Sequence, residues 1–281
     1  MITRAVPSDV PAMAGFLAGH MERSMFLLGN LQAHGLDETD HPHGTSYFLR
    51  RAGDRIAGIF AITNGGYLMV QHPGLDAAAA RDWVREIDGR EVRGITGDDA
   101  QARQIVEALG FAPEAWEIDR AEPLYRLLLA DLPKLSVTSR EAREADLDLL
   151  MSWLRAYGEE TGTGNDPQSL EERARSVLNS ERLRLLIEGG KPVAMTGINT
   201  RAGHTVQVGG VYVPPELRGQ GRAGQVVAAH LEVLRAGGAE TAILFAASPV
   251  AAGAYERIGF QRIGDYRVSM LRKPARVKVP A

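Results

Sequence analysis

Cysteine is absent from the 281 residues, and this absence excludes disulfides, thiolate metal ligands and a cysteine nucleophile. Group transfer by this chain therefore cannot pass through a cysteine thiol. Long apolar runs are also missing, since none reaches the roughly 18 residues that a membrane-spanning helix needs. The first residues lack a basic region followed by an apolar core. We therefore expect a cytoplasmic protein with no membrane partner.

A block of lysine and arginine is likewise absent, and the formal net charge is −3 at pH 7. This charge pattern gives no indication of nucleic acid or of an anionic membrane surface as a partner. A length of 281 residues is long for one ordinary domain and suits two, each large enough to bury a core. A homodimer is kept as a possible assembly.

Histidines and acidic residues gather in one polar loop of the first half, where they could suggest a metal site. Their spacing matches no metal-binding motif, and a His-Pro-His sequence in a polar loop is usually only a loop. We therefore predict no metal at His34, Asp37, Glu38, Asp40, His41 and His43.

The first half alternates apolar helices and strands in the order of an α/β domain. A helix starting at Ser8 or Asp9 reaches about His20, and a helical apolar face continues through Leu31. The remaining predicted elements are strands at 46–50, 55–63, 67–71 and 91–96, helices at 76–87 and 100–109, two strands within 114–132 and a linker at 132–134.

The second half begins with a helix at Ala145 or Asp146 and a second helix over 168–178. Three antiparallel strands follow, and the chain then returns through a helix to a further strand. These elements are predicted at 183–187, 193–200 and 205–213 for the three strands, 225–234 for the helix, 241–246 for the next strand and 265–272 for the last one.

The predicted strand at 205–213 leads directly into a glycine-rich turn and a helix. Gly209 and Gly210 permit a bulge, and Pro214-Pro215 ends the pairing. Small side chains within 218–224 let a ligand approach the backbone, and the unpaired amides of the first helical turn attract an anion. This combination suits a pyrophosphate.

Two motifs in the second half resemble those of the GNAT superfamily of N-acetyltransferases. Arg218, Gly221 and Ala223 form Arg-x-x-Gly-x-Ala, which is similar to the family's acyl-CoA-binding motif. The segment 248–260 resembles the family's Asn-x-x-Ala-x-x-x-Tyr-x-x-x-Gly-Phe, with Ser248 in place of Asn and Tyr255 at the tyrosine. Both motifs stand in order, with a helix-length gap between them.

The first half carries a weaker copy of the second motif. At a constant offset of 149 positions, Asp99, Ala102, Val106, Gly110 and Phe111 align with Ser248, Ala251, Tyr255, Gly259 and Phe260. No Arg-x-x-Gly-x-Ala follows the strand at 67–71, and Val106 replaces the tyrosine. We therefore predict a tandem arrangement, with a degenerate GNAT-like domain at 1–132 and an acetyl-CoA-binding catalytic domain at 136–281.

The resemblance implies an α/β (α+β) fold in which each domain has a mixed, mostly antiparallel twisted sheet flanked by helices. It also implies acetyl-CoA as co-substrate, lying between the strands that end at Val213 and Ala246. The backbone of Val211, Tyr212 and Val213 would pair with the pantetheine. The pyrophosphate would be held by the amides of Gly219, Gln220, Gly221, Arg222, Ala223 and Gly224, and the sequence does not choose between Arg218 and Arg222 as the added charge.

The same resemblance implies direct attack by a small amine or amino-acid-like acceptor, with Tyr255 protonating the departing thiolate. Ser248 would orient the pantetheine or, through water, Tyr255. Trp153 and Tyr157 are candidate acceptor contacts. The strand at 205–213 carries no carboxylate, and Gln207 and Tyr212 are its only long polar side chains, so the base is assigned to Glu159, Glu160 or a water chain.

Three alternatives remain at the level of sequence. Tyr255 could pack on the cofactor without transferring a proton. The chain could be a non-catalytic acyl-CoA-binding or interaction module, since one copy is degenerate and no base is evident. The same cradle could also serve O-acetylation of an alcohol.

Overall fold

The computed structural model describes residues 1–36, 39–162 and 167–279 and divides into two compact units. Unit 1 comprises Met1–Glu122 together with Asp265–Ala281, and unit 2 comprises Pro123–Gly264. Within the described residues, no helix combines the length and the apolar character needed to cross a membrane.

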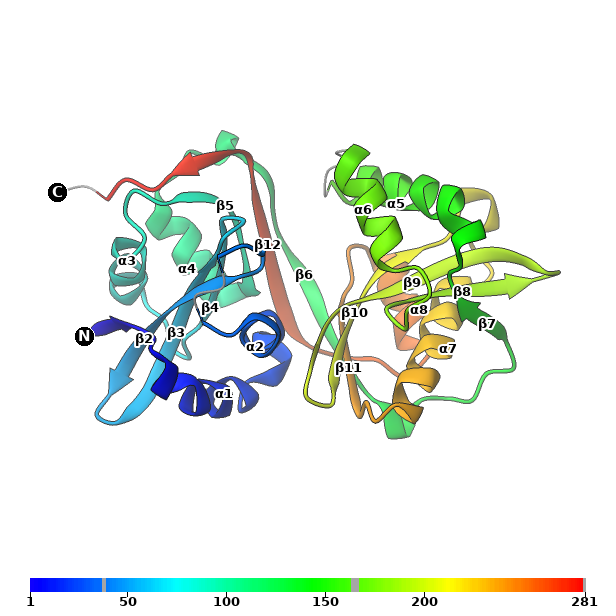
Figure 1. The fold of residues 1–281 in the computed structure, drawn as a ribbon, viewed down its shortest axis with the longest axis horizontal. Coiled ribbons are helices and arrows are strands. Elements are labelled where there is room, and N and C mark those ends of the chain that lie inside the picture. Colours follow the sequence, from blue (N-terminus) through cyan, green and yellow to red (C-terminus); the bar gives the residue numbers. More distant parts are fainter. Residues whose placement is uncertain (37–38, 163–166, 280–281) are drawn as a thin grey trace. The chain divides into compact units, whose positions relative to one another are not determined.

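The two halves of the sequence follow the same order of elements (Figure 1). The first half contains β1 (Ile2–Arg4), α1 (Val10–Ala18), α2 (Met21–His34), β2 (Thr45–Ala52), β3 (Arg55–Thr63), β4 (Tyr67–Gln71), α3 (Ala77–Arg85), β5 (Glu91–Asp98), α4 (Asp99–Leu109) and β6 (Trp116–Leu128). The second contains β7 (Thr138–Glu141), α5 (Leu147–Thr161), α6 (Pro167–Ser176), β8 (Leu183–Glu188), β9 (Lys191–Ala202), β10 (Thr205–Tyr212), α7 (Arg222–Ala236), β11 (Thr241–Phe245), α8 (Pro249–Glu256) and β12 (Gln261–Arg276).

Each unit has a mixed, mostly antiparallel sheet flanked by helices, which confirms the predicted fold class. The strand order is β1-β2-β3-β4-β5-β12-β6 in unit 1 and β6-β11-β10-β9-β8-β7 in unit 2. The parallel pairs are β4 with β5 and β10 with β11. Each of these pairs is joined by a crossover helix, α3 or α7, as parallel neighbours require.

The last strand of each half of the sequence extends into the other unit. In β12, the segment from Tyr266 to Arg276 pairs with β5 of unit 1. In β6, the segment from Leu124 to Leu128 pairs with β11 of unit 2. The compact units therefore differ from the domains predicted at 1–132 and 136–281.

Burial of apolar side chains explains this difference. Leu127 and Leu132 lie in the core of unit 2, although they precede the predicted linker or belong to it. Leu271 and Val277, from the end of the chain, lie in the core of unit 1 beside Trp83. Removing these side chains from water stabilises the exchanged arrangement, which a boundary drawn at a proline-containing turn cannot reveal.

Gly94→Ala is expected to destabilise unit 1, because the new methyl group would overlap the carbonyl oxygen of Ser269 on the paired strand β12. Overpacking of this kind costs about 3 kcal/mol. Urea unfolding, with hydrogen exchange at the β12 amides, measures the effect. Gly97→Ala is the matched control, since its methyl group would lie 3.6 Å from the Val70 oxygen at ordinary contact distance. Equal stability of the two variants would contradict the observed pairing.

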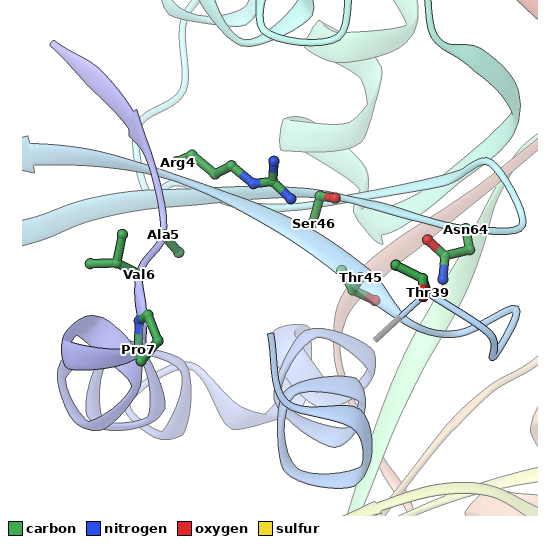
Figure 2. Close-up of a pocket in the computed structure, with 8 residues that line it drawn as sticks. All are labelled: Arg4, Ala5, Val6, Pro7, Thr39, Thr45, Ser46 and Asn64. Carbon is green, nitrogen blue, oxygen red and sulfur yellow. The ribbon is translucent and has the colours of Figure 1, made fainter. Parts of the chain in front are cut away.

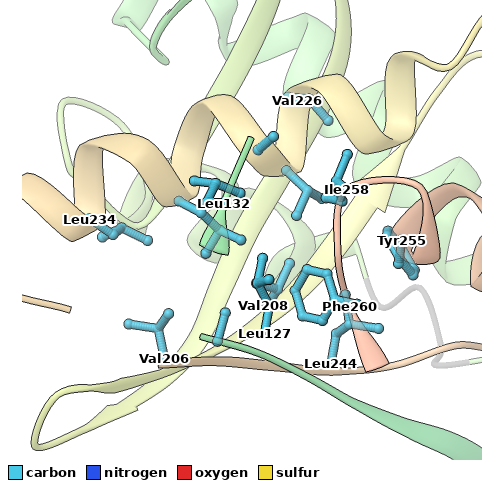
Figure 3. Close-up of a cluster of buried hydrophobic side chains, with 14 of the residues drawn as sticks. Leu127, Leu132, Val206, Val208, Val226, Leu234, Leu244, Tyr255, Ile258 and Phe260 are labelled. Atoms are coloured by element: carbon cyan, nitrogen blue, oxygen red, sulfur yellow. The ribbon is translucent and has the colours of Figure 1, made fainter. Parts of the chain in front are cut away.

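Helices cover both faces of each sheet. In unit 1, α3 and α4 contribute to one core, and Figure 1 shows α1 and α2 on the other side of the sheet. In unit 2, α7 and α8 pack on one face, where Val206 and Val208 of β10 meet Ile258 and Phe260 (Figure 3). The opposite face is covered by α5 and α6, which pack around Trp153 and Tyr212.

His230 on α7 is buried, with 2% of its surface exposed. Its Nε2 lies 2.6 Å from the carbonyl oxygen of Glu181, so this nitrogen carries the proton and donates it. The buried Nδ1 has no partner among the described residues. Burial lowers the pKa of His230 to about 4, because a second ring proton would have no acceptor.

His230→Gln is expected to reduce the loss of unfolding free energy that occurs as the pH falls from 7 to 4. A histidine whose folded pKa is depressed contributes stability that is complete above the unfolded pKa of about 6.5 and is lost as the pH falls. The loss amounts to about 3 kcal/mol by pH 4. Urea unfolding from pH 7 to 4 measures it, and His204→Gln, at an exposed histidine of the same unit, controls for the loss of one imidazole. An unchanged acid slope in His230→Gln would contradict the assignment.

Candidate functional site

The strands β10 and β11 part from each other in the middle of unit 2. They pair in parallel at Thr205↔Thr241, Val206↔Ala242 and Gln207↔Ile243, and no further rung joins them in the described chain. Strand β10 continues to Tyr212, with an irregular register opposite β9 between Gly209 and Tyr212. The edge of β10 beyond Gln207 is therefore available to an extended ligand that pairs as an added strand would.

The turn between β10 and α7 presents backbone amides. Gly219 and Gly221 have φ angles of +81° and +76°, and a Cβ at either would meet nothing within 4 Å. Among the described residues, no hydrogen bond engages the amides of residues 219–224. These open amides at the start of a long helix form a ready site for a phosphate group, and the exposed Gln220 lies within it.

Arg222 fixes the shape of this turn. Its Nε and Nη2 donate to the two carboxylate oxygens of Glu188 at 2.9 and 2.6 Å, and Nη1 donates to the Leu217 carbonyl at 2.7 Å. The Arg222 side chain is only 10% exposed. This hydrogen bond from Arg222 lowers the pKa of Glu188. Sequence reasoning missed Glu188, because a carboxylate in a hairpin carries no local signal of a distant arginine.

Arg218 occupies a different position, between the turn and the end of α5. Its Nε donates to the Val213 carbonyl at 2.8 Å, and its Nη2 donates to Glu160 Oε1 at 2.6 Å. The guanidinium carbon lies 5.8 Å from the ring centroid of Tyr212. Arg218 thus joins the candidate cofactor turn to the helix that carries the two candidate bases.

The last turn of α5 places Glu159 and Glu160 at the surface near Tyr212. Burial, followed by the charge of Glu160, raises the pKa of Tyr212. Trp153 is buried, and its ring centroid lies 6.0 Å from that of Tyr212. Trp153 therefore belongs to the core that supports this side of the sheet.

Tyr255 on α8 is 6% exposed and packs against Phe260, with ring centroids 6.1 Å apart (Figure 3). Burial raises the pKa of Tyr255, and the neighbouring Tyr157 adds to the shift. The phenol is therefore protonated near neutral pH and can donate its proton to a hydrogen bond. The structure brings Tyr157 of α5 and Tyr255 of α8 close enough to interact electrostatically.

Ser248 is the N-cap residue of α8, and its Oγ accepts a hydrogen bond from the Ala251 amide at 3.2 Å. Asparagine and serine are comparable N-cap residues. The departure from the family motif at Ser248 therefore preserves the start of the helix that carries Tyr255. Gly224 is buried where α7 meets α8, and a Cβ there would lie 2.9 Å from the Ala254 oxygen.

Gln207 lies at the last paired rung before the strands part, and only 1% of it is exposed. Its Nε2 donates to the Val208 carbonyl at 2.8 Å, while its Oε1 has no partner within the described residues. A buried acceptor without a donor is costly. The available signal was an amide side chain between valines in β10, two residues before Gly209, and no role was predicted for it.

The equivalent place in unit 1 is closed. At the offset of 149 positions, Ile243 corresponds to Gly94, since 243 − 149 = 94, and β4 and β5 keep pairing past Gly94 as far as Val70↔Gly97. The His72 amide donates to Gln101 Oε1, and the Trp83 Nε1 donates to His72 Nδ1 at 3.1 Å. Side chains of the unit itself thus occupy the turn after β4.

Unit 1 has a pocket, which lies away from the turn after β4. Figure 2 shows it at the end of β1 and the start of β2, lined by Arg4, Ala5, Val6, Pro7, Thr39, Thr45, Ser46 and Asn64. None of these residues belongs to β4, α3 or α4. The pocket therefore does not correspond to the parted strands of unit 2.

His34, at the end of α2, lies near the histidines of the polar loop: the ring centroids of His34 and His41 are 4.1 Å apart and those of His41 and His43 are 5.4 Å apart. Asp37 and Glu38 lie outside the described residues. Among the residues that are described, no group of three or more histidine, aspartate or glutamate side chains is arranged to hold a metal ion.

Residues 147–260 match the model of the Acetyltransferase (GNAT) family. The chain thus carries a GNAT-family domain within unit 2, which confirms the resemblance found in its two motifs. No curated protein matches the chain in a sequence search.

Solved structures share the fold over almost the whole chain. A Drosophila protein has 15% identity and a TM-score of 0.63, over 96% of this chain and 98% of its own. A GCN5-related N-acetyltransferase from Sphaerobacter thermophilus has 17% identity and a TM-score of 0.57, over 100% and 97%. An acetyltransferase of the GNAT family from Colwellia psychrerythraea has 15% identity and a TM-score of 0.55, over 97% and 100%.

At these identities the neighbours establish the fold. The family match over residues 147–260 supports acyl transfer from acetyl-CoA.

Proposed function

We propose that unit 2 transfers the acetyl group of acetyl-CoA directly to a small amine or amino-acid-like acceptor. The observation that carries this proposal is the parting of β10 and β11 after Gln207↔Ile243, beside the open amides of residues 219–224. The edge of Val211–Val213, at which the Val213 carbonyl already accepts from Arg218, suits the amide groups of pantetheine, and the turn suits the diphosphate. Only a short loop separates this strand edge from the turn, so a single extended ligand can bind to both.

Arg222 and Arg218 have separate roles in this proposal. Arg222 positions the turn, because it donates to Glu188 and to the Leu217 carbonyl and its side chain is nearly buried. Arg218 is 45% exposed and supplies positive charge to the diphosphate. Ser248 positions Tyr255 by starting α8.

Tyr255 acts as the proton donor in the transfer. The acceptor nitrogen forms a bond to the thioester carbonyl carbon, the carbon–sulfur bond breaks, and Tyr255 protonates the leaving sulfur. An amide of residues 211–213 donates to the carbonyl oxygen as negative charge develops there. The proton of the acceptor ammonium leaves through Glu159, Glu160 or water.

Aromatic and acidic side chains on the α5 side favour an amine over an alcohol as acceptor. Glu159 and Glu160 supply negative charge beside Tyr212, and an ammonium group complements both carboxylates. Unit 1 is a degenerate copy in this proposal, because its strands remain paired and its turn is filled by His72 and Gln101.

Incubation of the full chain with acetyl-CoA and a panel of amines tests the function. The panel contains lysine, spermidine, glucosamine and phenethylamine, with thiol release and acetylated product both measured. An N-acetylated product supports the proposal. Tight binding of acetyl-CoA without any product would favour a binding module, and an ester product would favour O-acetylation.

A further inference from the structure

We propose that Arg218 and Glu160 couple the binding of the two substrates. In the ligand-free chain Glu160 holds Arg218; the diphosphate of acyl-CoA takes Arg218 away, and the released carboxylate binds the ammonium group of the acceptor. Binding of either substrate then favours binding of the other. This inference rests on the proposed function and adds a regulation of the same site.

The position of Arg218 allows one side chain to serve both sites. Its Nε is anchored on the Val213 carbonyl at 2.8 Å, at the end of the edge that suits pantetheine. Its Nη2 reaches Glu160 on α5 at 2.6 Å. Gly219, whose amide is open, is the next residue in the chain. Moving Nη2 away from Glu160 therefore frees the guanidinium for a ligand bound at the turn.

Because the ion pair of Arg218 with Glu160 is exposed, little free energy is needed to break it. The side chains of Arg218 and Glu160 are 45% and 46% exposed, and ion pairs at such surfaces contribute little to stability. A diphosphate offers the planar guanidinium two oxygens and a higher charge than one carboxylate. The open amides of residues 219–224 hold the same diphosphate, so Arg218 gains a fixed partner.

The ion pair of Arg222 with Glu188 is held more firmly than that of Arg218 with Glu160. Arg222 binds both oxygens of Glu188 and also the Leu217 carbonyl, and its side chain is 10% exposed. Breaking this pair would deform the turn itself. Arg218, with a single contact to its carboxylate, is the arginine that can change partners.

After Arg218 has moved to the diphosphate, the carboxylate of Glu160 is placed to bind the acceptor. Glu160 lies near Tyr212, on the side of the sheet that α5 covers. Removal of Arg218 leaves Glu160 and Glu159 beside each other without that cation. An ammonium group restores the charge balance, so the acceptor binds more tightly when acyl-CoA is bound, and acyl-CoA binds more tightly when the acceptor is bound.

Calorimetric titration of coenzyme A into three forms of the full chain tests the coupling. Glu160→Gln removes the competitor for Arg218 and is expected to tighten coenzyme A binding about fivefold. Glu159→Gln is the matched control, because it removes one neighbouring carboxylate that forms no ion pair with Arg218 in the described chain. We expect its affinity for coenzyme A to stay within about twofold of the parent.

Pantetheine, which lacks the diphosphate, supplies the second arm and is expected to bind Glu160→Gln and the parent equally. With the panel amine that the parent acetylates fastest, Glu160→Gln should raise the acceptor KM at least tenfold while lowering the KM for acetyl-CoA. Equal tightening in both glutamine variants, no tightening in Glu160→Gln, or tightening toward pantetheine would each overturn the coupling. Failure of the parent to bind coenzyme A would overturn the proposed function as well.

Discussion

Gly221→Glu is expected to weaken acetyl-CoA binding at least 100-fold, which corresponds to about 2.7 kcal/mol. Gly221 is the N-cap residue of α7 and has a φ of +76°, a conformation that a residue with a side chain adopts at a cost. A Cβ there meets nothing within 4 Å, so the new carboxylate extends into the space before the open amides. It would repel the diphosphate and compete for the same donors.

The parent chain is expected to bind one acetyl-CoA per chain in the calorimetric titration. Gly238→Glu is the matched control, because Gly238 follows the other end of α7 with a φ of +85° and also has open space around it. This control imposes the same strain and the same charge away from the turn. Two sites per chain would show that unit 1 also binds, and comparable losses in both variants would attribute the effect to folding.

Tyr255→Phe is expected to lower kcat about 100-fold and to leave the affinity for acetyl-CoA within about threefold. The substitution removes only the hydroxyl group, so the packing of the ring against Phe260 is kept. Because burial raises the pKa of Tyr255, the parent phenol is protonated across the pH range of the assay and is always able to donate. Single-turnover kinetics with the fastest panel amine separate the chemical step from binding.

Tyr125→Phe provides the comparison for Tyr255→Phe. Tyr125 is a buried tyrosine of the same unit, and its hydroxyl donates to Glu256 on α8 at 2.8 Å. Losing this hydrogen bond costs about 1 kcal/mol of stability and should leave kcat unchanged. A parental rate in Tyr255→Phe would assign that residue to packing and remove its role as acid.

Local patterns in the sequence were sufficient for most of the elements and for the turn. The prediction of two strands within 114–132 was wrong, because that segment forms the single strand β6, and the short strands β1 and β7 were not predicted. The bulge and end of β10 follow from Gly209-Gly210 and Pro214-Pro215, and the helix start follows from the small residues of 218–224. The fold class and the GNAT domain are confirmed for the same reason, since both depend on motifs whose residues are neighbours in the chain.

Partners that are distant in the sequence could not be predicted in the same way. The pairs Arg218 with Glu160 and Arg222 with Glu188 join residues that are 58 and 34 positions apart. The sequence did not show which of these two arginines adds positive charge at the diphosphate, because charge alone does not show which arginine is fixed by other residues of the protein. The partner of each arginine is what separates an anchored residue from one that can exchange.

The sequence by itself determined where the candidate cofactor turn lies, because the order strand, glycine-rich turn and helix is local and occurs with its arginine only after β10. Tertiary structure alone decided where the units end. The pairing of β12 with β5 and of β6 with β11 depends on which core buries the apolar side chains of those strands. A strand in which apolar and polar side chains alternate fits the edge of either sheet. Only packing in three dimensions therefore selects the strand with which it pairs.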